Sequence, residues 1–394
     1  MAAPARQSML KPKLTESDHP TLLLVIGTLQ SGGAERQISD MANYWAARDW
    51  KVILATWSGP EIADFYPIDK RVLRVRLSMK AKGSMKRSRI RANLRRVAQL
   101  RRLLVSTRPD VALSFLTEVN VVTILAGAGL KLRVVVSERV QPALHHALPW
   151  TWRILRRILY RWADAVVAQT KDAAQWLTRN CRTAVTVIPN ALRSLPDPTG
   201  EREASIVAVG RLAHQKGFDV LLRAFARIAP AFQDWRLTII GEGEERQNLT
   251  RLCGELLLDD RVEFAGQRPD TVAWLAHAGL VVQPSRFEGF PNVVLEGMGL
   301  GAAVISANCA SGPSDIIEDG INGRLVPVDD VDKLAEVMTE LLSCPDERDR
   351  LGRAASTVRE RFRQDLVMDQ WEACLFPNSR GRQRSAPGRV GESK

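Results

Sequence analysis

The sequence lacks any long apolar run. No uninterrupted run exceeds the five residues of 22–26, far below the roughly 20 apolar residues that a membrane-spanning helix needs. Residues 1–20 carry three basic side chains but no apolar core ahead of a cleavage site, so they do not predict a secretory signal peptide. We expect them to form a disordered tail.

Cysteine is also scarce. The chain has five cysteines, an odd number, and they are widely spaced with no C-x-x-C motif. This pattern predicts neither a disulfide framework nor a zinc site. We expect five reduced thiols in a cytoplasmic protein.

Acidic residues are few in the first half of the chain. Residues 1–200 hold 32 Lys and Arg against 14 Asp and Glu, whereas the remainder holds 24 against 30. A length of 394 residues favours two domains. One basic and one acidic half indicate that the positive charge serves a local anionic partner rather than the whole molecule.

Residues 71–108 contain fourteen Lys and Arg and no Asp or Glu. Apolar residues recur there at helical spacing, and residues 150–162 (WTWRILRRILYRW) interleave arginines with aromatic side chains. Both stretches predict helices that bind an anionic membrane surface from the cytoplasmic side. A solvated cationic helix face is the plainer alternative. Nucleic-acid binding is not favoured, because no helix-turn-helix, zinc or RNA-recognition pattern accompanies the charge.

Short apolar strand patterns alternate with helical patterns along most of the chain, which predicts parallel, doubly wound α/β sheets. The first set of strands is expected at 21–27, 52–56, 72–77, 111–115, 134–137, 165–168 and 185–188. The second set is expected at 206–210, 237–241, 262–264, 280–283, 303–307 and 324–327.

We therefore expect two Rossmann-like domains, residues 21–195 and 203–361, that face each other across a cleft. The Pro-, Asp- and Gly-containing segment between them is expected to be a linker. A helix at 362–376 is expected to pack back toward the first domain, and a disordered basic tail to follow at 377–394.

One stretch combines two carboxylates with a helix start. Glu288 lies in a Gly- and Pro-containing loop after an apolar strand, and Glu296 lies one turn into the next helical pattern. Asn292 is the expected N-cap, so the first backbone N–H groups of this helix can face a ligand. The layout fits a nucleotide sugar, which has sugar hydroxyls, a diphosphate and ribose hydroxyls in a row.

Two further stretches fit an anionic ligand. Residues 28–35 form a small-residue turn between a strand and a helix, where Gly33 lets backbone N–H groups approach a phosphate. Arg211 and Lys216 flank a short loop after another strand and place two cations at its carboxyl end.

Taken together, these motifs resemble glycosyltransferase family 4, the retaining nucleotide-sugar enzymes of the GT-B fold. The matching segments are SGGAE at 31–35, IPN at 188–190, GRLAHQKG at 210–217, IIGEGEE at 239–245, E-x7-E at 288–296 and DGINGRLV at 319–326. The segment SGPSDII at 311–317 is similar to members that extend polyprenyl-diphosphate-linked saccharides.

The resemblance implies roles for residues at matching positions. Arg211, Lys216 and Glu288 are implied to be catalytic: the two cations would neutralise the leaving diphosphate, and Glu288 would contact the donor sugar. Glu296 would bind the ribose hydroxyls. The donor-binding set implied in full is Gly33, Arg211, Lys216, Gly266, Gln267, Glu288, Gly289, Phe290, Pro291, Asn292, Val293 and Glu296.

The chain departs from the family pattern after the strand at 134–137. Many members have a His there that touches the donor sugar, whereas this chain has Glu138 and Arg139, which become acceptor-side candidates. No cofactor and no metal is implied. The D-x-D at Asp330 and Asp332 stands at a helix start, where Asp330 is expected to be an N-cap.

The expected function is transfer of a hexose or N-acetylhexosamine from a UDP-sugar to a lipid-linked saccharide in surface polysaccharide, oligosaccharide or glycan biosynthesis. The expected location is the inner face of the cell membrane, with the protein peripherally attached. One alternative is a GT-B sugar-nucleotide epimerase, which gives no reason for the basic amphipathic stretches. Another is a non-catalytic nucleic-acid-binding protein, which does not explain the paired glutamates.

Overall fold

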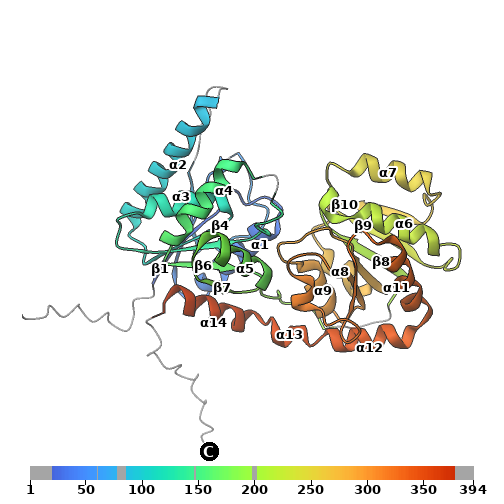
Figure 1. Cartoon of the computed structure of the whole chain (residues 1–394). Helices are drawn as coiled ribbons and strands as arrows, with labels where there is room; N and C mark the ends of the chain where they lie inside the picture. Colours follow the sequence, from blue (N-terminus) through green and yellow to red (C-terminus); the bar gives the residue numbers. More distant parts are fainter. Residues whose placement is uncertain (1–19, 60, 78–85, 146–147, 198–201, 378–394) are drawn as a thin grey trace, which may run out of the picture.

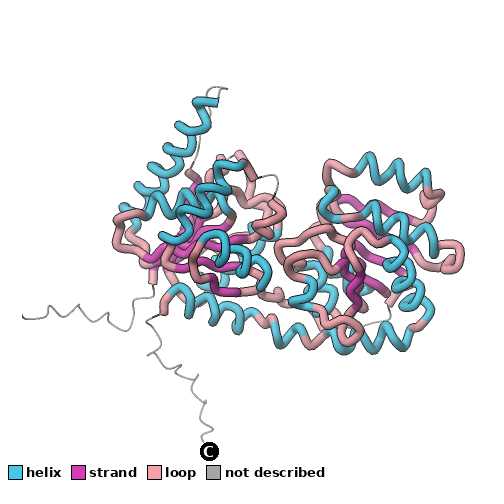
Figure 2. Tube along the Cα trace, viewed as in Figure 1, coloured by secondary structure: helices cyan, strands magenta, loops and turns pink. Residues whose placement is uncertain are grey.

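The computed structural model describes residues 20–59, 61–77, 86–145, 148–197 and 202–377. These residues form two α/β units that lie side by side, each built on one sheet with helices against it (Figures 1 and 2). Apart from Pro20 and Pro377, the predicted terminal tails lie outside the described residues, as do residues 78–85 of the basic segment and residues 198–201 of the predicted linker.

The first sheet has seven parallel strands in the order β3-β2-β1-β4-β5-β6-β7. Its strands are β1 (Thr21–Val25), β2 (Lys51–Thr56), β3 (Leu73–Arg76), β4 (Val111–Phe115), β5 (Arg133–Glu138), β6 (Ala165–Ala168) and β7 (Val185–Val187). The central strands are buried on both sides, which explains their predominantly apolar sequences.

Helices cover both faces of this sheet. They are α1 (Gly33–Ala46), α2 (Lys86–Thr107), α3 (Thr117–Gly127), α4 (Trp150–Leu159), the 3-10 turn η1 (Tyr160–Trp162) and α5 (Lys171–Cys181). Leu22 and Leu24 of β1 pack with α1, whereas Leu23 and Val25 pack with α2 and α3 on the other face. Since successive side chains of a strand point to opposite faces, β1 serves both layers.

The second sheet has six parallel strands in the order β10-β9-β8-β11-β12-β13. Its strands are β8 (Ser205–Val209), β9 (Arg236–Ile240), β10 (Val262–Gly266), β11 (Leu280–Gln283), β12 (Val304–Ala307) and β13 (Arg324–Val326). One core cluster joins this sheet to α6 (Phe218–Ile228), α7 (Arg246–Glu255) and α11 (Val331–Ser343), and another joins it to α8 (Thr271–His277) and α9 (Asn292–Gly299).

The helical segments of the second unit begin with η2 (His214–Lys216), α6 (Phe218–Ile228), α7 (Arg246–Glu255), α8 (Thr271–His277) and α9 (Asn292–Gly299). They continue with α10 (Pro313–Ile316), α11 (Val331–Ser343), α12 (Pro345–Ala355) and α13 (Val358–Arg361). The chain then runs back beneath the first unit as α14 (Gln364–Leu375) (Figure 1). The buried side chains of α14, Trp371 among them, join the core cluster of α1 and β1.

The predicted fold class is confirmed: all thirteen predicted strands are present, each with ends within two residues of the prediction. Two local expectations need correction. Asn292 is the first residue of α9 rather than its N-cap, which is Pro291. Strand β5 extends to Glu138, one residue beyond the predicted end, and this moves Glu138 from a loop into the sheet.

Candidate functional site

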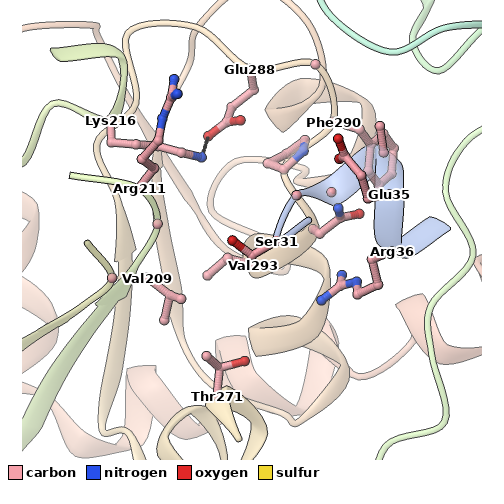
Figure 3. A pocket seen from close by; sticks show the side chains of 18 of the residues that line it. Ser31, Glu35, Arg36, Val209, Arg211, Lys216, Thr271, Glu288, Phe290 and Val293 are labelled. Carbon is pink, nitrogen blue, oxygen red and sulfur yellow. Dashed lines mark hydrogen bonds and ion pairs between the residues drawn. The ribbon is translucent and has the colours of Figure 1, made fainter. Parts of the chain in front are cut away.

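A cavity of about 820 Å³ lies between the two units, at the carboxyl ends of their strands. Of the predicted donor residues, all but Gly266 line it, and Arg139 of the acceptor-side pair lines it too. Figure 3 shows Glu35 and Arg36 of α1 on one side of the cavity and Arg211, Lys216 and Glu288 of the second unit on the other. Gly266 ends β10 outside the cavity wall, and its neighbours Gln267 and Arg268 take part in the wall instead.

Glu288 is the best-connected carboxylate of the second unit's wall. Its Oε1 lies 2.7 Å from Lys216 Nζ, an ion pair drawn in Figure 3. The same oxygen accepts hydrogen bonds from Ser285 Oγ at 2.7 Å and from Gln283 Nε2 at 3.0 Å. A carboxylate that is only 5% exposed and has three donors is held in one orientation. Lys216 and Glu288 thus form a preorganised ion pair close to the end of β11.

The local backbone explains how Lys216 reaches Glu288. Gly217 follows Lys216 with a φ of +64°, and a Cβ there would lie 2.2 Å from the carbonyl oxygen of Pro284. Only glycine permits both the left-handed conformation and this close approach. The loop after β8 therefore lies directly on the loop after β11. Arg211, at the start of the first of these loops, is exposed at the cavity's edge.

Glu296, the second glutamate of the pair, lies in α9 with its side chain 4% exposed. Its Oε1 lies 2.7 Å from Arg36 Nη2 of α1 and 3.3 Å from Arg193 Nε. Neither arginine was predicted from the sequence as a site residue. Arg36 directly follows the SGGAE motif and Arg193 follows IPN by three positions, so both motifs mark the region without identifying the pairing.

Asn190 of the IPN motif connects the two walls of the cavity. Its Nδ2 donates to Asn292 Oδ1 at 2.8 Å, and its Oδ1 accepts from Gln169 Nε2 at 2.7 Å and from Arg139 Nη2 at 3.1 Å. A Cβ added to Gly33 would lie 3.2 Å from Asn292 Nδ2, so the start of α1 faces the start of α9. Two helix N-termini, each with free N–H groups, therefore meet at this part of the cavity.

Glu138, the other acceptor-side candidate, lies inside the first unit rather than on the cavity wall. It is 2% exposed and accepts hydrogen bonds from Tyr160 Oη at 2.6 Å and from Thr117 Oγ1. Arg156 Nη1 lies 3.8 Å from Glu138 Oε1, and the Arg156 side chain is itself buried. Burial raises the pKa of Glu138, and the charge of Arg156 partly opposes that effect. This network ties β5 to α3 and α4.

The D-x-D motif has a structural role at its first residue. Asp330 is the N-cap of α11, as predicted, and its side chain accepts a hydrogen bond from the backbone N–H of Lys333 at 2.8 Å. Among the residues that the structure describes, no group of three or more His, Cys, Asp or Glu side chains is arranged to hold a metal ion.

Comparison with known families agrees with this architecture. Residues 31–193 match the model described as Glycosyltransferase Family 4, and residues 196–358 match the one described as Glycosyl transferases group 1. The two matches adjoin and extend over both sheets. The chain therefore belongs to the family 4 glycosyltransferases, and it is an enzyme of that class.

Characterised relatives differ in their length. An exopolysaccharide phosphotransferase of Streptomyces coelicolor is 29% identical over 403 residues, which cover 94% of this chain but only 42% of that protein. A Campylobacter jejuni N-acetylgalactosaminyltransferase, whose name specifies a PP-undecaprenol-linked saccharide, is 28% identical over 351 residues. That match covers 88% of this chain and 96% of the relative.

Solved structures show the same two-unit fold. Sucrose-phosphate synthase from Thermosynechococcus elongatus superposes with a TM-score of 0.79 at 19% identity, covering 92% of this chain and 100% of that one. The Anabaena protein HepE, solved with UDP and glucose, gives a TM-score of 0.77 at 19% identity, with 91% and 100% covered. These likenesses establish the GT-B fold of the present chain.

Proposed function

We propose that this enzyme transfers a hexose or N-acetylhexosamine from a UDP-sugar to a lipid-linked saccharide, with retention of configuration, in the synthesis of a surface polysaccharide, oligosaccharide or glycan. The observation that carries the proposal is the convergence of Arg211, Lys216, Glu288 and Glu296 on one cavity. The UDP bound to HepE and the PP-undecaprenol-linked saccharide in the name of the Campylobacter relative support the choice of donor and acceptor.

The cavity supplies a partner for each part of such a donor. Arg211 and Lys216 are the cations for the diphosphate, whose charge grows as the sugar departs. Glu288 is held where it can accept hydrogen bonds from sugar hydroxyls, and Glu296 where it can accept them from the ribose. The first turn of α9, at Val293, offers a backbone N–H group between the two glutamates, whereas the N–H of Asn292 donates to the carbonyl oxygen of Phe290.

The proposed chemistry needs no separate base. The acceptor hydroxyl oxygen bonds to the anomeric carbon on the face from which the diphosphate leaves. The bond from that carbon to the phosphate oxygen breaks, and a phosphate oxygen takes the proton of the hydroxyl. The fixed cations stabilise the oxocarbenium-like transition state by holding the departing negative charge. Metal is not required in this scheme, because Arg211 and Lys216 perform the neutralisation.

The lipid-linked acceptor is proposed to reach the enzyme at an anionic membrane surface. No helix among the described residues is both long and apolar enough to cross a bilayer. Instead, α4 and η1 expose Trp150, Ile154, Ile158 and Trp162 at four-residue intervals. The exposed arginines 153, 157 and 161 stand directly before the last three of them. Such a stripe suits the boundary between headgroups and acyl chains.

Helix α2 extends the same face of the first unit. Its C-terminal half packs on the sheet through Leu100 and Leu104, whereas Ile90 and Leu94 are 69% and 64% exposed on the part that projects from the body of the unit (Figure 1). Thus only the C-terminal half of the predicted apolar face of this helix packs against the rest of the protein. Arg91 and Arg95 accompany the exposed half, and α3 lies between α2 and α4.

The experiment that tests the proposal incubates the purified chain with a panel of UDP-sugars and a polyprenyl-diphosphate-linked saccharide. We expect one donor to yield a longer lipid-linked product together with UDP, and product analysis to show a retained anomeric configuration. Interconversion of the free UDP-sugar without transfer would instead indicate an epimerase. Absence of both reactions across the panel, with the protein folded, would refute the proposal.

A further inference from the structure

Arg139 is a buried cation without a counter-charge. It is 6% exposed, and its guanidinium lies over the ring of Phe115 at 4.0 Å. Its Nη2 donates to Asn190, but Nε and Nη1 have no hydrogen-bond partner among the described residues. No Asp or Glu of the described part of the chain forms an ion pair with it. Burying an unpaired charge lowers the stability of a protein, so a gain in stability does not explain why Arg139 is buried.

The surroundings of Arg139 belong to the donor end of the cavity. Gly289, which follows Glu288, comes so close that a Cβ there would lie 2.2 Å from the carbonyl oxygen of Arg139. Asn190 links Arg139 to Asn292, at the start of α9, and the start of α1 faces the same asparagine. One guanidinium and two helix N-termini therefore present positive potential to one region of the cavity wall, which Arg139 itself lines.

We infer that Arg139 is an anion-binding residue of the first unit, whose missing counter-charge is an oxyanion of the donor. This inference rests on the proposed function, because it takes a nucleotide sugar as the occupant of the cavity. The oxyanion has two possible sources with the same chemistry, the diphosphate that every donor carries or a carboxylate on the sugar of a uronic-acid donor. Either oxyanion would bind between the two units, in contact with Arg139 of the first unit and with groups of the second.

Burial also lowers the pKa of Arg139 to about 9. The pKa falls because desolvation disfavours the charged form of the guanidinium and no neighbouring carboxylate opposes this effect. An incoming anion removes part of this penalty, so binding at Arg139 is stronger than at an exposed arginine. Lys216 differs in this respect, because Glu288 already compensates its charge.

The test compares the wild-type chain with Arg139→Gln and Arg139→Lys by isothermal titration with UDP, UDP-glucose and UDP-glucuronate. If the diphosphate is the partner, Arg139→Gln weakens binding of all three about ten- to a hundredfold, and Arg139→Lys, which keeps the charge, loses less. If a sugar carboxylate is the partner, Arg139→Gln weakens UDP-glucuronate alone. Both results support the inference and distinguish its two sources.

A melting temperature measured without nucleotide separates binding from structure. Because the variant removes an uncompensated buried charge, Arg139→Gln should melt at or above the wild-type temperature. UDP-glucuronate, whose binding is weakened in either case, should raise its melting temperature less than it raises that of the wild type. The inference is overturned if Arg139→Gln binds all three nucleotides as the wild type does. It is overturned equally if the Gln and Lys variants lose affinity alike and both melt lower, which is the result of a structural role. A wild-type chain that binds none of the three contradicts the proposed function itself, and this inference with it.

Discussion

Arg36 Nη2 in the first unit lies 2.7 Å from Glu296 Oε1 in the second, so an ion pair joins the two walls of the cavity. The carboxylate is 4% exposed and the arginine side chain 24% exposed, which makes Arg36 the partner that can move into solvent. Glu296 is also the residue proposed to bind ribose hydroxyls. In this proposal the ribose and Arg36 compete for one carboxylate.

Removing this competitor should strengthen nucleotide binding. We expect Arg36→Gln to lower the dissociation constant for UDP about two- to fivefold, which corresponds to a partly exposed ion pair of up to about 1 kcal/mol. Glu296→Gln should raise the constant instead, because the ribose loses its charged acceptor. Isothermal titration measures both, with Arg48→Gln, at an exposed arginine in the turn just after the same helix, as the control. Equal weakening by Arg36→Gln and Glu296→Gln would show that Arg36 holds the nucleotide rather than competing with it.

Glu35 gives the site a defined pH dependence. Burial raises the pKa of its carboxyl above the ordinary 4.5, and Arg36 and Tyr66 are its charged and titratable neighbours on the cavity wall. As the pH rises through the raised pKa, Glu35 becomes negative in a cavity proposed to hold a diphosphate. As the pH rises above 4.5, UDP affinity should therefore fall more steeply in the wild type than in Glu35→Gln.

The two pH profiles are compared with each other, because the terminal phosphate of UDP titrates near pH 6 and does so identically for both proteins. The measured quantity is the ratio of the two dissociation constants at each pH. A ratio that stays constant over the whole range would show that Glu35 does not face the bound diphosphate.

Membrane attachment should depend on the exposed arginines of α2. Arg101 is exposed but donates to the carbonyl oxygens of Ala126 and Ala128 and so holds α2 to the unit. Three other exposed arginines of α2 are Arg91, Arg95 and Arg102. Replacing these three with Gln should release the chain from vesicles that contain anionic lipid, since each well-placed cation contributes about 1 kcal/mol. Sedimentation with vesicles measures the bound fraction.

A control of equal charge replaces three exposed arginines of the second unit, Arg223, Arg227 and Arg251. Hydrolysis of free donor should stay unchanged in both triple variants. In a separate variant, Trp150→Ala with Trp162→Ala should weaken vesicle binding at high salt, where apolar insertion outlasts the screened charges. If the α2 variant and the control sediment alike, the membrane surface lies elsewhere.

Trp371 should be essential for stability. It is 0% exposed in α14 and packs with the core of the first unit, whereas Leu366 on the same helix is 40% exposed. Trp371→Ala should lower the free energy of unfolding by about 3–5 kcal/mol, and Leu366→Ala should change it by about 0.5 kcal/mol or less. Urea denaturation measures both. Equal effects would mean that α14 is not part of that core.

The fold was predictable because its strands are short apolar runs that end at turn residues. The strands 111–115 and 280–283 have the same bounds in the sequence and in the structure, since buried parallel strands are mostly apolar, here with only Ser114 and Gln283 as polar members. Glu138 was misplaced by one residue of strand length. Once β5 extends to it, its side chain shares a face with Val134 and Val136, which point into the cluster beneath α3, α4 and α5.

The motif residues of the site were also predictable, because each is defined by a strand end and a local loop. The pairings between the units were not. Arg36 meets Glu296, and Asn190 meets Asn292, only because of how the first unit lies against the second. No local pattern in either segment encodes that arrangement. The free donors of Arg139 likewise became apparent only from its burial.

The most direct test of the central claim is titration of UDP into the wild type, Arg211→Ala, Lys216→Ala and the surface control Arg251→Ala. Each of the first two substitutions removes a charge-assisted contact of roughly 1.5–3 kcal/mol, so we expect both to weaken UDP binding about ten- to a hundredfold and to lower transfer activity at least as much. The control should bind as the wild type does. Unchanged UDP affinity in both folded variants would contradict the assignment of this cavity as the nucleotide-sugar site.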